Sequence, residues 1–174
     1  MGFSCPNACG LFTSGVTESV NLAVKGHRDA SLGALGLLGG GAHQQQDHSS
    51  SQQIPHILAA AHGGRVLNVV AGVTMHPTFD KACALPGLVL IKVPVEADTL
   101  AFSPHRAAQA MDGGTVLVVA SAPGFAHGVV DDVVGLGRVA ASHHLTLWRC
   151  GCAPARGYLP GGAAAVLHPW GPPL

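Results

Sequence analysis

Residues 13–19, TSGVTES, place small and hydroxyl-bearing residues around Gly15, immediately before a helical pattern. The first N–H groups of a helix have no partner within the helix and lie at the positive end of its dipole. Together with the hydroxyls of Ser14, Thr17 and Ser19, they can bind an anion such as phosphate. The same residues suit an ordinary helix start in which Ser14 or Thr17 is the N-cap. Taken alone, the stretch is compatible with both interpretations.

Two further stretches place polar side chains where an apolar run gives way to a helix. His76 begins HPTFDKA, and an imidazole there could stack on a flat ring or transfer a proton. The alternative is a half-buried histidine bonded to backbone. In SAPGFAHGVVDD, Ser121, His127 and Asp131 follow another apolar run. The alternative there is a plain loop in which Asp131 caps the next helix.

The elements that must position these residues are predicted from the hydrophobic pattern. Nearly unbroken, β-branched apolar runs suit strands that are buried on both faces, as in parallel sheets. Such runs lie at 66–73, 88–95 and 115–122, with a weaker fourth at 145–148. Helical patterns lie around them, at 16–30, 76–85, 103–112 and 131–144. The alternation predicts an α/β fold with a mainly parallel sheet, in which ligand-binding loops gather at the carboxyl ends of the strands.

Local signals mark two helix starts. Ser103 is the expected N-cap of the third helical pattern, with Pro104 at its first helical position. Pro77 is expected near the N-terminus of the second, where its missing N–H costs least.

Two segments break the alternation. Residues 31–56 are rich in Gly, Gln, Ser and His, lack a period, and are interpreted as a flexible insertion. In the tail, the three prolines within 169–173 are expected to prevent any regular element. We therefore divide the chain into a domain at 1–147 and a diverged or irregular tail at 148–174.

The composition bears on several classes of function. The 174 residues include nine basic and nine acidic ones, so no broad surface for nucleic acid is expected. No run of about 18 apolar residues exists, so no membrane span is predicted. The five cysteines follow no signal-like run, which favours thiols over a disulfide framework. A zinc site is an alternative, although the spacing of its possible ligands fits no standard module. These ligands would be Cys5, Cys9, His143, His144, Cys150 and Cys152.

The three motifs, in this order and at these distances, resemble one enzyme family. They are similar to motifs of the pyridoxal-phosphate-dependent lyases and group II decarboxylases, and in particular of the sphingosine-1-phosphate lyases. The resemblance covers roughly residues 10–147. It implies a partial three-layer αβα large domain of the aspartate aminotransferase fold.

The resemblance also implies the residues that bind the cofactor, pyridoxal 5′-phosphate. Ser14, Gly15, Val16 and Thr17 correspond to the turn that holds its phosphate, and His76 to the imidazole that stacks on its ring. The family motif has glycine where this chain has Val16. Because a branched side chain resists positive φ, we expect phosphate binding that is weakened but not lost.

A third loop completes this set. Ser121 and His127 correspond to residues that line the cofactor, and Asp131 to the aspartate that ends the motif.

The two residues that carry the family's chemistry are not found at their expected positions. The aspartate that pairs with the pyridine nitrogen corresponds to Cys150, and a neutral thiol is a poor substitute for a carboxylate. None of the three lysines matches the lysine that the family attaches to the cofactor, and a faint match in the tail puts Ala155 there. We therefore assign no catalytic residue and expect a fragment without lyase activity. A tail read in the wrong frame or across an intron is the alternative.

For the full-length family, the resemblance implies a homodimer at the endoplasmic reticulum membrane. Its substrate would be a phosphorylated long-chain base, cleaved to a fatty aldehyde and ethanolamine phosphate. This chain alone is expected to be soluble and cytoplasmic. Two alternatives stay open: an amino-acid decarboxylase of the glutamate or tyrosine type, and a non-catalytic remnant that binds phosphate or a partner subunit.

Overall fold

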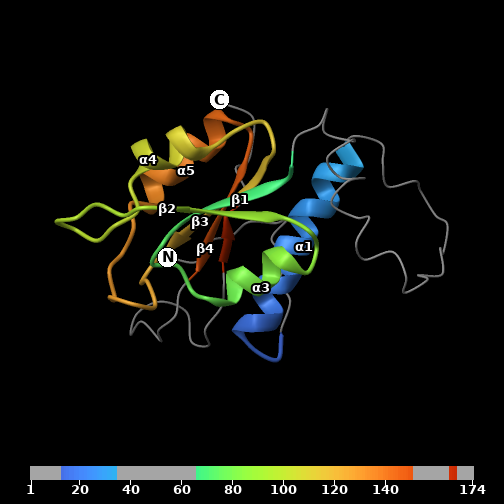
Figure 1. Ribbon diagram of the computed structural model, residues 1–174, viewed down its shortest axis with the longest axis horizontal. Coiled ribbons are helices and arrows are strands. Elements are labelled where there is room, and N and C mark those ends of the chain that lie inside the picture. The colour runs from blue at the N-terminus through green and yellow to red at the C-terminus, as the bar shows by residue number, and fades with distance from the viewer. Residues whose placement is uncertain (1–12, 35–65, 151–164, 168–174) are drawn as a thin grey trace, which may run out of the picture.

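The computed structural model describes residues 13–34, 66–150 and 165–167, which form a sheet with helices on both faces (Figure 1). The strands lie in the order β2-β1-β3-β4-β5. From β2 to β4 all neighbours pair in parallel, whereas β5 is antiparallel to β4. The strands are β1 (Asn68–Gly72), β2 (Val89–Val93), β3 (Thr115–Ser121), β4 (Thr146–Cys150) and β5 (Ala165–Leu167).

Two pairs of helices cover the sheet. α1 and α3 pack against each other on one face, and α4 and α5 on the other (Figure 1). This is the predicted three-layer αβα arrangement. The helices are α1 (Val16–Ala34), α3 (Thr78–Ala84), α4 (Pro104–Ala110) and α5 (Val133–Ser142). None of the helices in the described part of the chain is long and apolar enough to cross a membrane.

The central strands are buried on both faces because successive side chains enter different cores. Val69 and Leu117 point into the core beneath α1 and α3. Val70 and Val118, the next residues along, point into the core beneath α4 and α5. Both faces therefore need apolar residues, which explains the unbroken runs in β1 and β3.

Strand β2 corrects one expectation, because it lies at the edge of the sheet. Val89 is 49% exposed, and Lys92 is exposed and pairs with Asp80 of α3 through Nζ and Oδ1, 2.6 Å apart. The apolar run at 88–95 predicted a strand here correctly, but not its place in the sheet.

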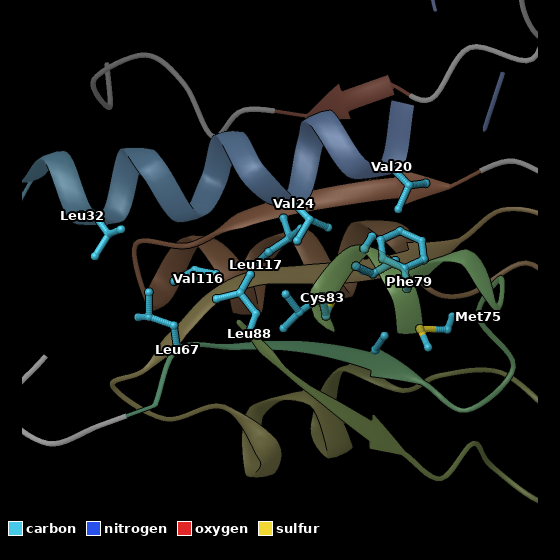
Figure 2. Close-up of a cluster of buried hydrophobic side chains, with 14 residues drawn as sticks. Val20, Val24, Leu32, Leu67, Met75, Phe79, Cys83, Leu88, Val116 and Leu117 are labelled. Carbon is cyan, nitrogen blue, oxygen red and sulfur yellow. The ribbon is translucent and has the colours of Figure 1, made fainter. Parts of the chain in front are cut away.

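Helix α1 runs antiparallel to β1, which brings its first turn to the carboxyl ends of the strands. In Figure 2, Val20 near the start of α1 lies close to Phe79 and Met75, which follow β1 in the chain. Leu32 near the end of α1 lies at the opposite end of the same core, toward Leu67 at the start of β1.

The same packing explains why α1 is longer than predicted. Leu32 is buried and continues the stripe of Val20 and Val24 at intervals of four and eight residues. The helix therefore continues to Ala34, four residues into the segment 31–56 that we interpreted as an insertion. The rest of that segment lies outside the described residues.

Two differences concern the tail. β4 continues to Cys150, beyond the predicted boundary at 147, because its backbone pairs with β3 as far as Ser121. β5 also contradicts the expectation that the tail has no regular element, since Ala165–Leu167 pairs with β4 before the prolines begin. The two helix-start predictions are confirmed: Ser103 is the N-cap of α4 with Pro104 after it, and Pro77 is the N-cap residue of α3.

Cys83 shows how tightly α3 is packed. Its thiol is free and buried in the core beneath α1 and α3. Burial, with a smaller contribution from the negative charge of Asp80, raises the pKa of this thiol to about 12. The group is therefore a neutral, apolar core residue at physiological pH.

We expect Phe79→Ala to lower the free energy of unfolding by about 3–5 kcal/mol, because it leaves a cavity at the centre of this core. Phe79 is fully buried. Leu85→Ala at the end of the same helix is the control, since Leu85 is 74% exposed and its truncation should cost no more than about 0.5 kcal/mol. Urea unfolding followed by circular dichroism measures both. Equal losses in the two variants would contradict the assigned core.

Candidate functional site

The predicted site residues come from loops that meet at the carboxyl edge of the sheet. Because the strands are parallel, the ends of β1, β3 and β4 lie at one edge. His76 follows β1, Ser121 is the last residue of β3, and the first turn of α1 lies over the same edge. The fold therefore brings together segments that are far apart in the sequence.

The turn before α1 is closed by its own side chains. Both the N–H and the hydroxyl of Ser14 donate to Oε2 of Glu18, at 2.6 and 2.7 Å. The hydroxyl oxygens of Thr13 and Ser19 are 2.6 Å apart. Ser14 thus donates to the helix, which is the reverse of the N-cap role that we considered for it. Glu18 instead reaches back over the helix start, much like the glutamate of a capping box.

Donors for an anion remain in this turn. The first bond of the helix runs from the N–H of Ser19 to the carbonyl of Gly15 at 3.1 Å. The N–H groups of Val16, Thr17 and Glu18 therefore have no partner within the helix. A Cβ added at Gly15 would meet nothing within 4 Å, so the approach to this turn is open.

Val16 does not need a glycine conformation. It is the first residue of α1, and among the described residues only Leu100 and His144 are non-glycine residues with positive φ. A branched side chain is compatible with this backbone, since the turn is made with negative φ. The conformational reason for weakened phosphate binding is thereby removed.

His76 is held by its backbone surroundings and by an aromatic ring. Its Nδ1 accepts a hydrogen bond from the N–H of Thr78 at 3.2 Å, so the neutral imidazole carries its proton on Nε2. The ring of Phe125 meets it edge to face, with centroids 5.0 Å apart and an interplanar angle of 69°. His76 is half-buried, as the alternative interpretation expected, and it also lies at the predicted edge.

Ser121 and Asp131 close the base of the loop between β3 and α5. The N–H of Ser121 donates to Oδ2 of Asp131 at 2.6 Å, and the N–H of Asp131 donates to the carbonyl of Ser121 at 2.9 Å. The cap of α5 is Asp132, whose Oδ1 accepts from the N–H of Gly135 at 2.9 Å. The interpretation of Asp131 as this cap is therefore wrong, because its carboxylate turns inward instead.

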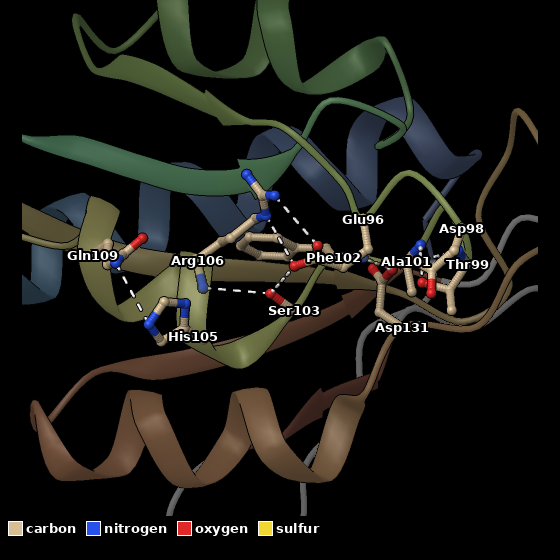
Figure 3. Close-up of polar contacts among 10 residues, drawn as sticks. All are labelled: Glu96, Asp98, Thr99, Ala101, Phe102, Ser103, His105, Arg106, Gln109 and Asp131. Carbon is tan, nitrogen blue, oxygen red and sulfur yellow. Dashed lines mark hydrogen bonds and ion pairs between the residues drawn. The ribbon is translucent and has the colours of Figure 1, made fainter.

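Asp131 is a buried carboxylate bonded to two backbone groups. Its Oδ1 accepts from the N–H of Phe102 at 2.9 Å (Figure 3). Burial raises the pKa of this carboxyl, and the N–H bonds from Phe102 and Ser121 oppose that rise.

His127 and Phe125 both lie on the loop between β3 and α5. His127, for which the resemblance implies a place beside the cofactor, is exposed on this loop. Phe125, which sequence reasoning passed over, contacts the ring of His76 although it is 59% exposed. An aromatic residue in a glycine-containing loop after a predicted strand was the signal available in the sequence.

The positions expected to carry chemistry hold unsuitable residues. Cys150, which the resemblance matches to the family's carboxylate, ends β4 and pairs in register with Ser121. The lysine side chains are engaged or lie on helix surfaces: Lys25 pairs with Asp29, Lys92 with Asp80, and Lys81 is exposed on α3. The described residues thus provide donors and a flat imidazole, but neither carboxylate nor amine for covalent chemistry.

The zinc alternative involves six residues, three of which the structure describes. Cys5, Cys9 and Cys152 lie outside the described residues. Within the described ranges, no three histidine, cysteine, aspartate or glutamate residues are grouped so that they could hold a metal ion.

Comparison with known sequences finds curated relatives that share part of this chain. No protein-family model matches the chain. The sphingosine-1-phosphate lyase of Saccharomyces cerevisiae is 32% identical over 147 residues, which are 83% of this chain and 20% of that protein. The sphingosine-1-phosphate lyase of Oryza sativa subsp. japonica is 30% identical over 139 residues, which are 80% and 21%. The chain thus spans about a fifth of the length of the curated relatives that it matches.

Comparison with solved structures supports the same fold. Oryza sativa TDC, solved with PLP and tryptamine, has a TM-score of 0.58 at 22% identity over 81% of this chain and 27% of its own. A sphingosine-1-phosphate lyase of Burkholderia pseudomallei has a TM-score of 0.51 at 21% identity over 84% of this chain and 36% of its own. The described elements are therefore part of the fold of pyridoxal-phosphate-dependent enzymes.

We expect the carboxyl of Glu18 to titrate below its ordinary pKa, because the backbone N–H and then the hydroxyl of Ser14 stabilise the charged form. This lowered pKa contributes stability that is present above the ordinary glutamate pKa and is lost as the pH falls through the folded value. A ¹³C NMR titration of the Glu18 carboxyl measures the midpoint. Ser14→Ala should raise it part of the way, since the backbone bond remains, whereas Thr17→Ala should leave it unchanged. An unshifted midpoint in the wild-type chain would contradict the closed turn.

Proposed function

Because this chain is a relative of the sphingosine-1-phosphate lyases, we propose that it forms part of the cofactor site of a pyridoxal-phosphate-dependent carbon–carbon lyase. The observation that carries the proposal is the meeting of three motifs at one sheet edge. The turn before α1, His76 after β1 and Ser121 at the end of β3 occur in the order expected for that family.

The residues present fit the phosphate and the ring of pyridoxal 5′-phosphate. The unpaired N–H groups of Val16 and Thr17, at the positive end of the α1 dipole, would hold the phosphate beside the open face of Gly15. The imidazole of His76 would lie against the ring, held by Thr78. Ser121, and His127 on the exposed side of its loop, would line the remaining wall.

The residues present do not fit covalent chemistry on that cofactor. When bound in a complete enzyme, pyridoxal phosphate accepts the electrons of a breaking bond, which requires a protonated ring nitrogen. Cys150 occupies the position where a carboxylate would keep that proton, and none of Lys25, Lys81 and Lys92 matches the family's cofactor-linked lysine. We therefore derive no bond-breaking step for these residues and propose non-covalent cofactor binding.

For a complete protein of this type we propose the activity of its relatives. The substrate would be a phosphorylated long-chain base, with a fatty aldehyde and ethanolamine phosphate as products. We also propose a homodimer and a location at the endoplasmic reticulum. An amino-acid decarboxylase is the weaker alternative, since the curated relatives quoted above are sphingosine-1-phosphate lyases, whereas likeness to Oryza sativa TDC is one of fold. A non-catalytic remnant that binds phosphate or a partner subunit is compatible with the same donors.

We expect the chain to bind pyridoxamine 5′-phosphate more tightly than pyridoxamine, because the α1 donors recognise the phosphate. The amine form is the better probe, since it cannot react with surface lysines. Val16→Gly should change the dissociation constant less than about threefold, or roughly 0.7 kcal/mol, because Val16 already has a helical conformation. His76→Ala should weaken binding through lost ring contact. A fluorescence titration measures all three chains.

Two results would contradict this view. Equal affinity for the phosphorylated and unphosphorylated probes would exclude α1 as the phosphate site. A large gain in Val16→Gly would show that the valine obstructs the turn after all.

We also expect no turnover of a phosphorylated long-chain base by the purified 174-residue chain supplied with pyridoxal phosphate. The reason is the absence of a suitable lysine and carboxylate. Release of long-chain aldehyde, followed by mass spectrometry, is the measurement. Aldehyde formed catalytically above a protein-free blank would show that another residue replaces them.

A further inference from the structure

The loop between β3 and α5 reaches from a buried carboxylate to the imidazole of the candidate site. Residues 121 and 131 close its base through two hydrogen bonds, one of which uses the side chain of Asp131. Phe125 lies farther out in the loop and contacts the ring of His76. Loss of the hydrogen bonds at the base of the loop can therefore displace Phe125 and, through it, the imidazole of His76.

Asp131 ties this loop to a second segment. The carboxylate is only 6% exposed, and each oxygen accepts one backbone N–H: that of Ser121 at 2.6 Å and that of Phe102 at 2.9 Å. Neither of these partners is a cation. A carboxylate provides two acceptor oxygens for these two N–H groups, whereas an asparagine amide of the same shape provides only one.

The segment that carries Phe102 is a firm anchor. Phe102 is fully buried, and it packs so closely on the end of β1 that a Cβ at Gly72 would lie 2.9 Å from Cβ of Phe102. On one side, Glu96 accepts from the hydroxyl of Ser103 at 2.7 Å and from Nε of Arg106 at 2.8 Å (Figure 3). The N–H of Phe102 is therefore a fixed point from which Asp131 can hold the loop.

The loop transmits this constraint because it has internal bonds. The N–H of Gly124 donates to the carbonyl of Val129 at 2.7 Å, and the N–H of Gly128 donates to the carbonyl of Gly124 at 3.0 Å. Gly128 has a φ of 67°, which a residue with a side chain rarely adopts. These bonds flank Phe125 and limit where its ring can lie.

The imidazole is thereby held from two sides. The N–H of Thr78 fixes the direction of Nδ1 from within the β1–α3 connection. Phe125 meets the ring from the β3–α5 loop and opposes its rotation. Losing the second contact would leave the hydrogen bond in place but free the ring plane.

We propose that Asp131 is a positioning residue for His76, acting through the loop 121–131 and the ring of Phe125. The coupling itself is a property of the cofactor-free chain. Its importance for binding rests on the proposed function of His76 as the residue that stacks on the cofactor ring. Asp131 itself is not proposed to contact the cofactor.

The test compares the chemical shifts of the His76 ring protons in three variants of the cofactor-free chain. Two of the variants replace an aspartate by the isosteric asparagine, and the third replaces an exposed phenylalanine. Phe125→Leu removes the ring current and should shift the carbon-bound ring protons of His76. Asp131→Asn leaves one of its two N–H partners without an acceptor and should shift the same protons in the same direction. Asp132→Asn is the matched control, because it changes the adjacent carboxylate and asparagine is an equally good N-cap. It should leave the His76 signals unchanged.

A folded Asp131→Asn chain with unchanged His76 signals would refute the proposal, as would an Asp132→Asn chain with the same shift. If Asp131→Asn is unfolded in buffer, it is measured in sucrose, which favours the folded state by exclusion from the protein surface. A variant that stays unfolded there also counts against the proposal, because Asp131 would then be needed for folding as a whole.

Cofactor binding is scored separately with pyridoxamine 5′-phosphate. Asp131→Asn should bind it more weakly than Asp132→Asn does. If the wild-type chain does not bind this probe but Asp131→Asn still shifts the His76 signals, the proposed function fails and the positioning role stands.

Discussion

Parallel pairing of β1 to β4 is the constraint on which the rest of the structure depends. Parallel strands cannot be joined by hairpins, so each connection must cross a face of the sheet. The crossing helices bury both faces, and β1 to β4 all end at the same edge. The antiparallel course of α1 then adds a helix N-terminus to that edge. Parallel pairing thus brings together backbone donors, an imidazole and a tight loop, the first and last of which are more than a hundred residues apart in the sequence.

The sequence predicted those strands and helices whose burial leaves a regular pattern of apolar residues. β1 and β3 are recognisable because both of their faces are buried, and α1 because its apolar stripe faces a core. The edge position of β2 is not encoded in its own run, since an apolar residue such as Val89 is compatible with a central or an edge strand. The end of α1 was missed because Leu32 lies in a segment rich in Gly, Gln, Ser and His, whereas its packing near Leu67 shows that the helix continues.

The parts of the site formed by backbone N–H groups could be predicted from the sequence. The parts that depend on the orientation of a side chain were harder to predict. The start of α1 provides its N–H groups whatever residue stands at Val16, so the substitution there leaves the turn intact. Asp131 and Asp132 are chemically alike, and no local pattern says which one turns inward. The fold decides, because the N–H groups of Ser121 and Phe102 converge on Asp131 alone. Phe125 was missed for a similar reason, since its value lies in a contact with a residue nearly fifty positions earlier.

Cys83 gives this layered structure a built-in reporter. A thiol reagent reacts with the thiolate, and a buried thiol with a pKa of about 12 offers almost none at neutral pH. Modification of Cys83 must therefore wait until α3 separates from α1 and exposes the sulfur. The rate of that modification, followed at Cys83 by peptide mass spectrometry, therefore reports how often α3 separates locally from α1. These helices cover the face of the sheet that carries the α1 turn and His76.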